Sequence, residues 1–187
     1  MGATISPSIS RSLKRAFRPQ ALFMPPAEDR LFFSYGKQRA FTQALAATPR
    51  PLPQPPHPRP EPIVLVSRSH RDERTEQLLQ ALKPCEVRHL GSSLKFALVA
   101  AGEADIYLRP WPMMVWDCAA GHAIVEAAGG VVLGLDGSKV NYDPSEAGKV
   151  EGLVAARTSE LAARVLAASR NLRPSLPAGD AHGLSPT

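Results

Sequence analysis

Asp117 is the residue of this chain best placed to do chemistry, because it is a single carboxylate at the start of a run of apolar and small residues. The run spans residues 116–130 and reads WDCAAGHAIVEAAGG. A carboxylate in the first turn of a helix is stabilised by the helix dipole, and it lies beside free backbone N–H groups that can bind an anion. Asp117 is therefore a candidate metal ligand or general base. The alternative is that it only caps a buried helix.

Four more polar residues could bind a phosphorylated ligand: His70, Ser92, Lys95 and Arg109. Ser92 and Lys95 are three residues apart, directly after Gly91. In the first turn of a helix their hydroxyl and ammonium groups could converge with free N–H groups on one anion. Each residue also has a simpler explanation. His70 or Ser92 could cap a helix, and Lys95 or Arg109 could be a solvated surface charge.

Strands and helices that alternate along the chain would position these residues. Apolar patterns predict strands over residues 63–66, 86–90, 105–108, 131–133 and 152–155. They predict helices over residues 71–82, 92–101, 117–128 and 159–168. This alternation is typical of a layered α/β domain, which we place at residues 63–169.

The remaining segments have different patterns. Residues 1–20 are basic and serine-rich, and residues 170–187 show no periodicity, so we expect both ends to be disordered. Residues 21–47 contain two short strand patterns and predict a β-hairpin. Residues 48–62 are so rich in proline that we expect an extended linker that cannot pair. A ligand for an SH3-type domain is the functional alternative for this stretch.

Composition and charge argue against several classes of protein. The chain has 187 residues, and it lacks the run of about 18 apolar residues that a membrane span requires. The net charge of +5 comes from residues 1–50, where eight Lys and Arg face two acids; the rest carries fourteen against fifteen. With no helix-turn-helix or zinc pattern, a nucleic-acid partner is not expected. Cys85 and Cys118 are far apart, which fits a protein of the reducing cytoplasm without disulfides.

Four motifs together resemble the inositol monophosphatase superfamily of Mg-dependent phosphatases, and within it the 3'(2'),5'-bisphosphate nucleotidases. In chain order they are VSRSHRD (66–72), GSSLKF (91–96), ADIYLR (104–109) and WDCAAG (116–121). The resemblance implies a sugar-phosphatase type of C-terminal domain and a hydrolase that converts 3'-phosphoadenosine 5'-phosphate to AMP and phosphate during sulfur assimilation. It also allows peripheral association with the inner membrane.

The resemblance assigns roles to the candidate residues. His70, Ser92, Lys95 and Arg109 correspond to positions that contact the substrate, a nucleotide bisphosphate. Asp117 corresponds to a ligand of Mg²⁺, whose role in the family is to activate the attacking water.

The family's other metal ligands have no counterpart in this sequence. They belong to a glutamate and to an Asp-Pro-Ile/Leu-Asp-Gly-Thr motif of a first domain, and that motif is absent here. The resemblance covers residues 21–156, so we expect the hairpin at 21–47 to be a remnant of the first domain, and the chain to be truncated and weak or inactive alone. Residues 110–115 also depart from the family pattern. An inositol monophosphatase-like phosphatase and a noncatalytic nucleotide-binding remnant are the alternatives.

Overall fold

A five-stranded sheet forms the centre of the computed structural model, which describes residues 21–23, 30–35, 39–44, 47–53, 60–68, 72–91, 93–140, 142 and 148–172. Its strands, in spatial order, are β6 (Glu86–Leu90), β5 (Ile63–Ser67), β7 (Ile106–Arg109), β11 (Leu153–Ala156) and β9 (Val131–Gly134). β5 runs parallel to β6 and β7, whereas β11 is antiparallel to β7 and β9. β5 and β11 are continuous apolar runs because both faces of the sheet are covered.

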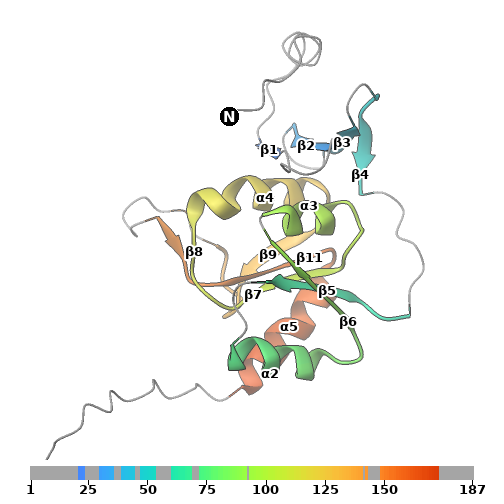
Figure 1. The fold of residues 1–187 in the computed structure, drawn as a ribbon. Helices are drawn as coiled ribbons and strands as arrows, with labels where there is room; N and C mark the ends of the chain where they lie inside the picture. The colour runs from blue at the N-terminus through green and yellow to red at the C-terminus, as the bar shows by residue number, and fades with distance from the viewer. Residues whose placement is uncertain are drawn as a thin grey trace, which may run out of the picture.

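Helices cover the two faces (Figure 1). On one face α2 (Glu73–Leu82) and α5 (Ser159–Asn171) pack against each other and on the sheet, and on the other lie α3 (Leu94–Ala100) and α4 (Val115–Ala127). Successive residues of β5 alternate between these layers, so that Val64 and Val66 contact the first and Leu65 the second.

A second sheet lies on the far side of α4 (Figure 1). It is an antiparallel meander of β1 (Ala21–Phe23), β2 (Arg30–Ser34), β3 (Ala40–Ala44) and β4 (Arg50–Leu52). Phe32 and Leu52 belong to the same buried cluster as Ile124 and Val125 of α4. Because α4 is packed between two sheets, it is apolar on nearly all sides rather than along one stripe.

The predictions for residues 21–62 were wrong in two respects. The structure has three strands within residues 21–47 instead of a two-stranded hairpin, and β4 lies inside the stretch expected to be a non-pairing linker. β4 pairs with β3, and its Pro51 stands opposite Phe41. A proline is tolerated there because β4 is an edge strand of this sheet. No strand lies on its open side to require an N–H donor from it. Residues 54–59 lie outside the described part.

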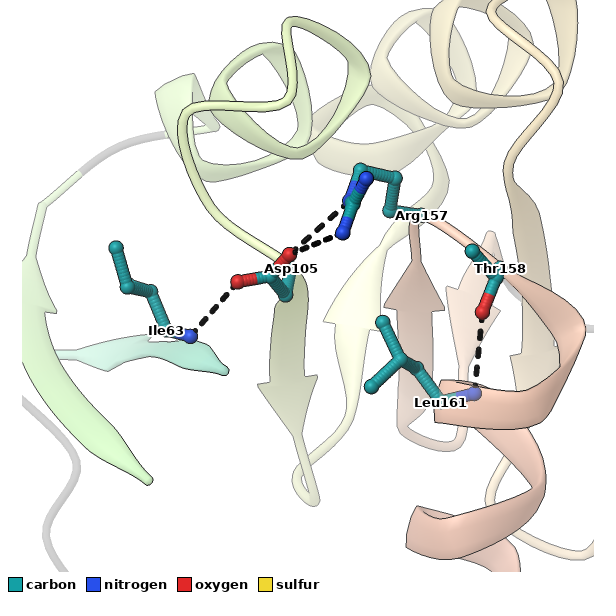
Figure 2. Close-up of polar contacts among 5 residues, drawn as sticks. All are labelled: Ile63, Asp105, Arg157, Thr158 and Leu161. Carbon is teal, nitrogen blue, oxygen red and sulfur yellow. Dashed lines mark hydrogen bonds and ion pairs between the residues drawn. The ribbon is translucent and has the colours of Figure 1, made fainter. Parts of the chain in front are cut away.

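Asp105 joins three strands at one end of the central sheet (Figure 2). Its buried carboxylate accepts hydrogen bonds from the Ile63 backbone N–H at 2.9 Å and from Nε of Arg157 at 3.0 Å. It also forms an ion pair with Nη2 of Arg157 at 2.9 Å. Ile63 begins β5, Asp105 directly precedes β7 and Arg157 directly follows β11. Thr158 then caps α5 by accepting a bond from the Leu161 N–H at 3.4 Å.

The layered α/β fold is confirmed, and each strand and helix predicted over residues 63–169 is present with ends shifted by a few residues. α5 continues to Asn171, so residues 170 and 171 belong to the helix and not to a tail. The disorder expected for residues 1–20 and 173–187 concerns residues outside the described part. Among the described residues, no helix has the length and apolar character needed to cross a membrane.

Candidate phosphate-binding pocket

A pocket of about 510 Å³ lies where the chain leaves β5 and β7 towards opposite faces of the sheet. β5 leads to α2 on one face, and β7 leads to α4 on the other (Figure 1). In open α/β sheets, ligands bind in the crevice at such a divergence of neighbouring parallel strands. The pocket is lined by Ser67, Ser93, Lys95, Tyr107, Arg109, Pro112, Met113, Met114, Asp117 and Lys149.

Lys95 is a buried cation in this pocket, with 2% of its surface exposed. Its Nζ donates to the Leu90 carbonyl at 3.1 Å and lies 5.0 Å from the centre of the Tyr107 ring. Burial, followed by the positive charges of Arg109 and Arg68, lowers the pKa of Lys95 to about 8. The alternative that Lys95 is a solvated surface charge is therefore wrong. An anion bound beside it would stabilise its charged form.

Arg109 ends β7 and is half-buried. Its Nη2 donates to the Pro112 carbonyl at 3.4 Å, while its buried Nε has no hydrogen-bond partner within the described structure. A buried donor of this kind is costly to leave unpaired. A ligand oxygen in the pocket could satisfy it.

Asp117 lies in the first turn of α4 and is exposed. The N-cap of α4 is Met114, so the alternative that Asp117 caps this helix is wrong. Ser93, the N-cap residue of α3, makes no side-chain cap bond; its Oγ donates instead to the Asp117 carbonyl at 2.7 Å. This bond holds the start of α3 against the start of α4.

Lys149 enters the pocket from a two-stranded ribbon. β8 (Met113–Met114) pairs with β10 (Lys149–Val150), and Lys149 stands opposite Met114. The Val115 N–H donates to the Gly148 carbonyl at 2.8 Å, which joins the ribbon to the first residue of α4. Lys149 therefore lies beside the helix start that carries Asp117.

The described residues do not by themselves fit a Mg²⁺ ion. Mg²⁺ requires near-octahedral oxygen ligands and is retained by carboxylates. Asp117 is the one carboxylate among the residues that line the pocket, beside the cations Lys95, Arg109 and Lys149. Across the described part of the chain, no group of three or more His, Cys, Asp or Glu side chains could hold a metal. The pocket as described is suited to an anion.

The structure brings three of the five predicted site residues together: Lys95, Arg109 and Asp117. His70 and Ser92 lie outside the described residues, so their roles remain predictions. Four polar lining residues were missed: Ser67, Ser93, Tyr107 and Lys149. The period of two in a strand could have found Tyr107, because it lies on the same face of β7 as Arg109. Lys149 reaches the pocket because β10 pairs with β8, a distant segment of the chain. No local pattern in the sequence indicates this pairing.

A cationic pocket at the carboxyl ends of parallel strands is typical of the class of proteins that bind small phosphorylated molecules. Comparison with known proteins makes the assignment specific. The profile of the inositol monophosphatase family matches residues 21–173, and the chain belongs to this family.

The relatives that the chain resembles in sequence include bisphosphate nucleotidases. The chain is 48% identical over 84 residues to the 3'(2'),5'-bisphosphate nucleotidase CysQ of Salmonella typhimurium, covering 45% of the chain and 34% of that protein. It is 37% identical over 94 residues to the 3'(2'),5'-bisphosphate nucleotidase of Dictyostelium discoideum, covering 48% and 28%. The chain therefore matches about a third of the length of these curated relatives.

The fold is similar to that of two solved structures, the first of which is a bacterial member of the inositol monophosphatase family. CysQ from Bacteroides thetaiotaomicron superposes with a TM-score of 0.65 at 29% identity, covering 73% of this chain and 57% of that one. SuhB of Mycobacterium tuberculosis gives a TM-score of 0.56 at 27% identity, with 75% and 54% covered. In both comparisons the match includes most of this chain and little more than half of the neighbour.

Proposed function

We propose that the chain binds a nucleotide bisphosphate between β5 and β7, as part of a phosphatase of the 3'(2'),5'-bisphosphate nucleotidase type. The charge of the pocket carries this proposal: Lys95, Arg109 and Lys149 line it with one carboxylate, Asp117. Two phosphate groups require several cations, and a nucleoside requires apolar surface for its base. The similarity to bisphosphate nucleotidases supports this ligand class.

In this proposal Lys95 and Arg109 bind phosphate. Lys95 is the stronger electrostatic contact, because its ammonium is buried and little water screens it. Arg109 offers a planar group of donors, including the unpaired Nε, that matches two phosphate oxygens. Lys149 would contact the second phosphate, and the apolar side chains of Pro112 and Met113 would contact the ribose or base. His70 and Ser92 are proposed as further contacts from the resemblance.

The proposed substrate is 3'-phosphoadenosine 5'-phosphate, which yields AMP and phosphate in the sulfur assimilation of the cytoplasm. In the family, Mg²⁺ supplies the activation of water for this hydrolysis. Because the described residues do not fit Mg²⁺, we propose that turnover depends on carboxylates besides Asp117. We therefore expect the chain to bind the substrate and to hydrolyse it weakly or not at all.

Two other functions are compatible with membership of the family. One is an inositol monophosphatase-like phosphatase, which the family assignment itself favours. The other is a noncatalytic nucleotide-binding protein, which the single carboxylate of the pocket favours. The relative affinities for a nucleotide bisphosphate and an inositol phosphate distinguish the first alternative from our proposal. Hydrolysis of the bound ligand distinguishes the second.

Competition binding and phosphate release, measured on one preparation, test the proposal. The purified chain is titrated with 3'-phosphoadenosine 5'-phosphate and with inositol 1-phosphate in excess Mg²⁺, and released phosphate is assayed. We expect at least tenfold tighter binding of the bisphosphate, with any release abolished in Asp117→Asn. Tighter binding of inositol 1-phosphate would overturn the nucleotide assignment. Rapid release would refute the dependence on further carboxylates.

A further inference from the structure

One hydrogen bond crosses the crevice from the loop after β7 to the start of α2. Nε1 of Trp111 donates to Oδ2 of Asp72. Trp111 follows β7, and Asp72 ends the connection from β5 to α2. The bond therefore joins the two chain segments that diverge around the pocket.

Asp72 is a firmly held acceptor. It is the N-cap of α2, and its two carboxylate oxygens accept bonds from the backbone N–H and the hydroxyl of Thr75, both at 2.8 Å. Although partial burial raises the pKa of Asp72, the hydrogen bonds from Trp111 and Thr75 outweigh it and hold the pKa below its ordinary value. The carboxylate is therefore ionised at neutral pH, and an ionised acceptor makes the stronger hydrogen bond.

Trp111 is coupled to the pocket through its neighbour. It stands between Pro110 and Pro112, and each proline ring fixes its own φ angle, so the short segment is stiff. Pro112 lines the pocket, and its carbonyl accepts the bond from Nη2 of Arg109. A displacement of Trp111 would therefore move the Pro112 carbonyl and with it the Arg109 guanidinium.

We propose that Trp111 is a positioning residue: its hydrogen bond to Asp72 sets the width of the crevice and the placement of Arg109 for the phosphorylated ligand. The inference rests on the proposed function, because it concerns the affinity of the same pocket. It adds Trp111, which does not line the pocket, to the residues that determine the affinity for the ligand.

Trp116 provides a matched control. Trp111 and Trp116 are the two large apolar side chains exposed in the described structure, at 39% and 71%. Trp116 lies next to Asp117, but the described residues include no hydrogen-bond partner for its indole. Replacing either tryptophan with phenylalanine removes the same N–H group, and only the change at Trp111 removes the bond across the crevice.

The test combines calorimetry and NMR on the full chain with the variants Trp111→Phe, Trp116→Phe, Asp72→Ser and the double variant Trp111→Phe/Asp72→Ser. Serine preserves a good N-cap for α2 but is too short to reach the indole. We expect Trp111→Phe and Asp72→Ser each to weaken binding of 3'-phosphoadenosine 5'-phosphate by about five- to tenfold, with no further loss in the double variant. Trp116→Phe should bind as the wild type does. In ¹⁵N–¹H spectra, Asp72→Ser should shift the Trp111 indole resonance and leave that of Trp116 unchanged.

The outcomes separate this inference from the proposed function. If Trp111→Phe binds the bisphosphate as tightly as the wild type does, the positioning role is overturned and the proposed function stands. The positioning role would also be overturned if the losses of affinity multiplied in the double variant. It would likewise be overturned if the Trp111 indole resonance did not shift in Asp72→Ser. A wild-type chain that binds no bisphosphate would overturn both. A purely structural role would lower the unfolding temperature of Trp111→Phe without changing the affinity of the folded protein.

Discussion

Lys95 shows how a single residue can work against the stability of the ligand-free protein. Its ammonium group is buried close to the positive charges of Arg109 and Arg68, and these surroundings lower its pKa to about 8. The same surroundings strengthen its attraction to a phosphate, because little water screens the contact. Lys95 therefore has the properties expected of a residue kept for binding.

We predict that Lys95→Met stabilises the ligand-free protein and abolishes binding. Methionine fills a similar volume without the cost of burying a charge, so the free energy of unfolding at pH 7 should rise by about 1–2 kcal/mol, even after loss of the bond to Leu90. Thermal unfolding measures the first effect and calorimetry with the bisphosphate the second. Destabilisation together with unchanged affinity would contradict the assignment.

The pH dependence follows from the pKa of Lys95. Phosphate binding favours the charged ammonium, so affinity should fall as the pH rises through about 8. Lys95→Arg, which stays charged, should lose this dependence. In the ligand-free protein the unfolded chain keeps its proton up to the ordinary pKa of 10.5, so wild-type stability relative to Lys95→Met should rise between about 8 and 10.5. Urea unfolding at several pH values measures this rise.

At the scale of elements, the start of β7 depends on Asp105. Its almost fully buried carboxylate accepts a hydrogen bond from the Ile63 N–H and forms an ion pair with Arg157. We expect Asp105→Ala to lower the free energy of unfolding by about 3–4 kcal/mol, because it leaves a partly buried guanidinium and a backbone N–H without their acceptor. Asp136→Ala is the control: that exposed carboxylate also accepts a backbone N–H bond, from Ser138, and its loss should cost less than about 1 kcal/mol.

The contact of α3 with α4 depends on a glycine. A Cβ atom on Gly121 would lie 2.5 Å from Cγ of Phe96, a residue with no exposed surface. Within a helix, Gly→Ala ordinarily stabilises by about 1 kcal/mol. We predict that Gly121→Ala instead destabilises by about 1–3 kcal/mol through overpacking, as measured by urea unfolding. Adding Phe96→Leu should recover part of the loss; ordinary stabilisation by Gly121→Ala alone would show that the two helices pack less closely.

At the scale of the whole molecule, the sequence predicted what local patterns determine. Apolar periodicity was sufficient for the five strands of the central sheet and the four helices after residue 62, because each is specified within its own segment. It failed for β4, where the position of Pro51 at a sheet edge decides whether the strand can pair. It also failed for Lys149, which a two-residue pairing with β8 brings to the pocket. The burial of Lys95 was equally hidden, since a lysine near a helix start usually faces water.

The central sheet, α3 and the ribbon of β8 and β10 bring residues from distant segments to one crevice. Lys95 comes from α3, Arg109 from β7 and Lys149 from β10, and the first and last are 54 positions apart in the sequence. This convergence supports the view that the domain recognises a ligand with more than one phosphate. The pocket contains a single carboxylate, Asp117. The described structure therefore supplies more of the groups needed to bind a phosphorylated ligand than of those needed to hydrolyse it.

Calorimetric titration of the purified chain and of Lys95→Met with 3'-phosphoadenosine 5'-phosphate, at pH 7 with Mg²⁺, tests the central claim most directly. Phosphate is assayed in the same samples. We predict that the wild type binds one equivalent with little or no release of phosphate, and that Lys95→Met does not bind although it is folded and at least as stable. Equal binding by both proteins, or binding by neither, would contradict the claim that this pocket recognises a nucleotide bisphosphate through Lys95.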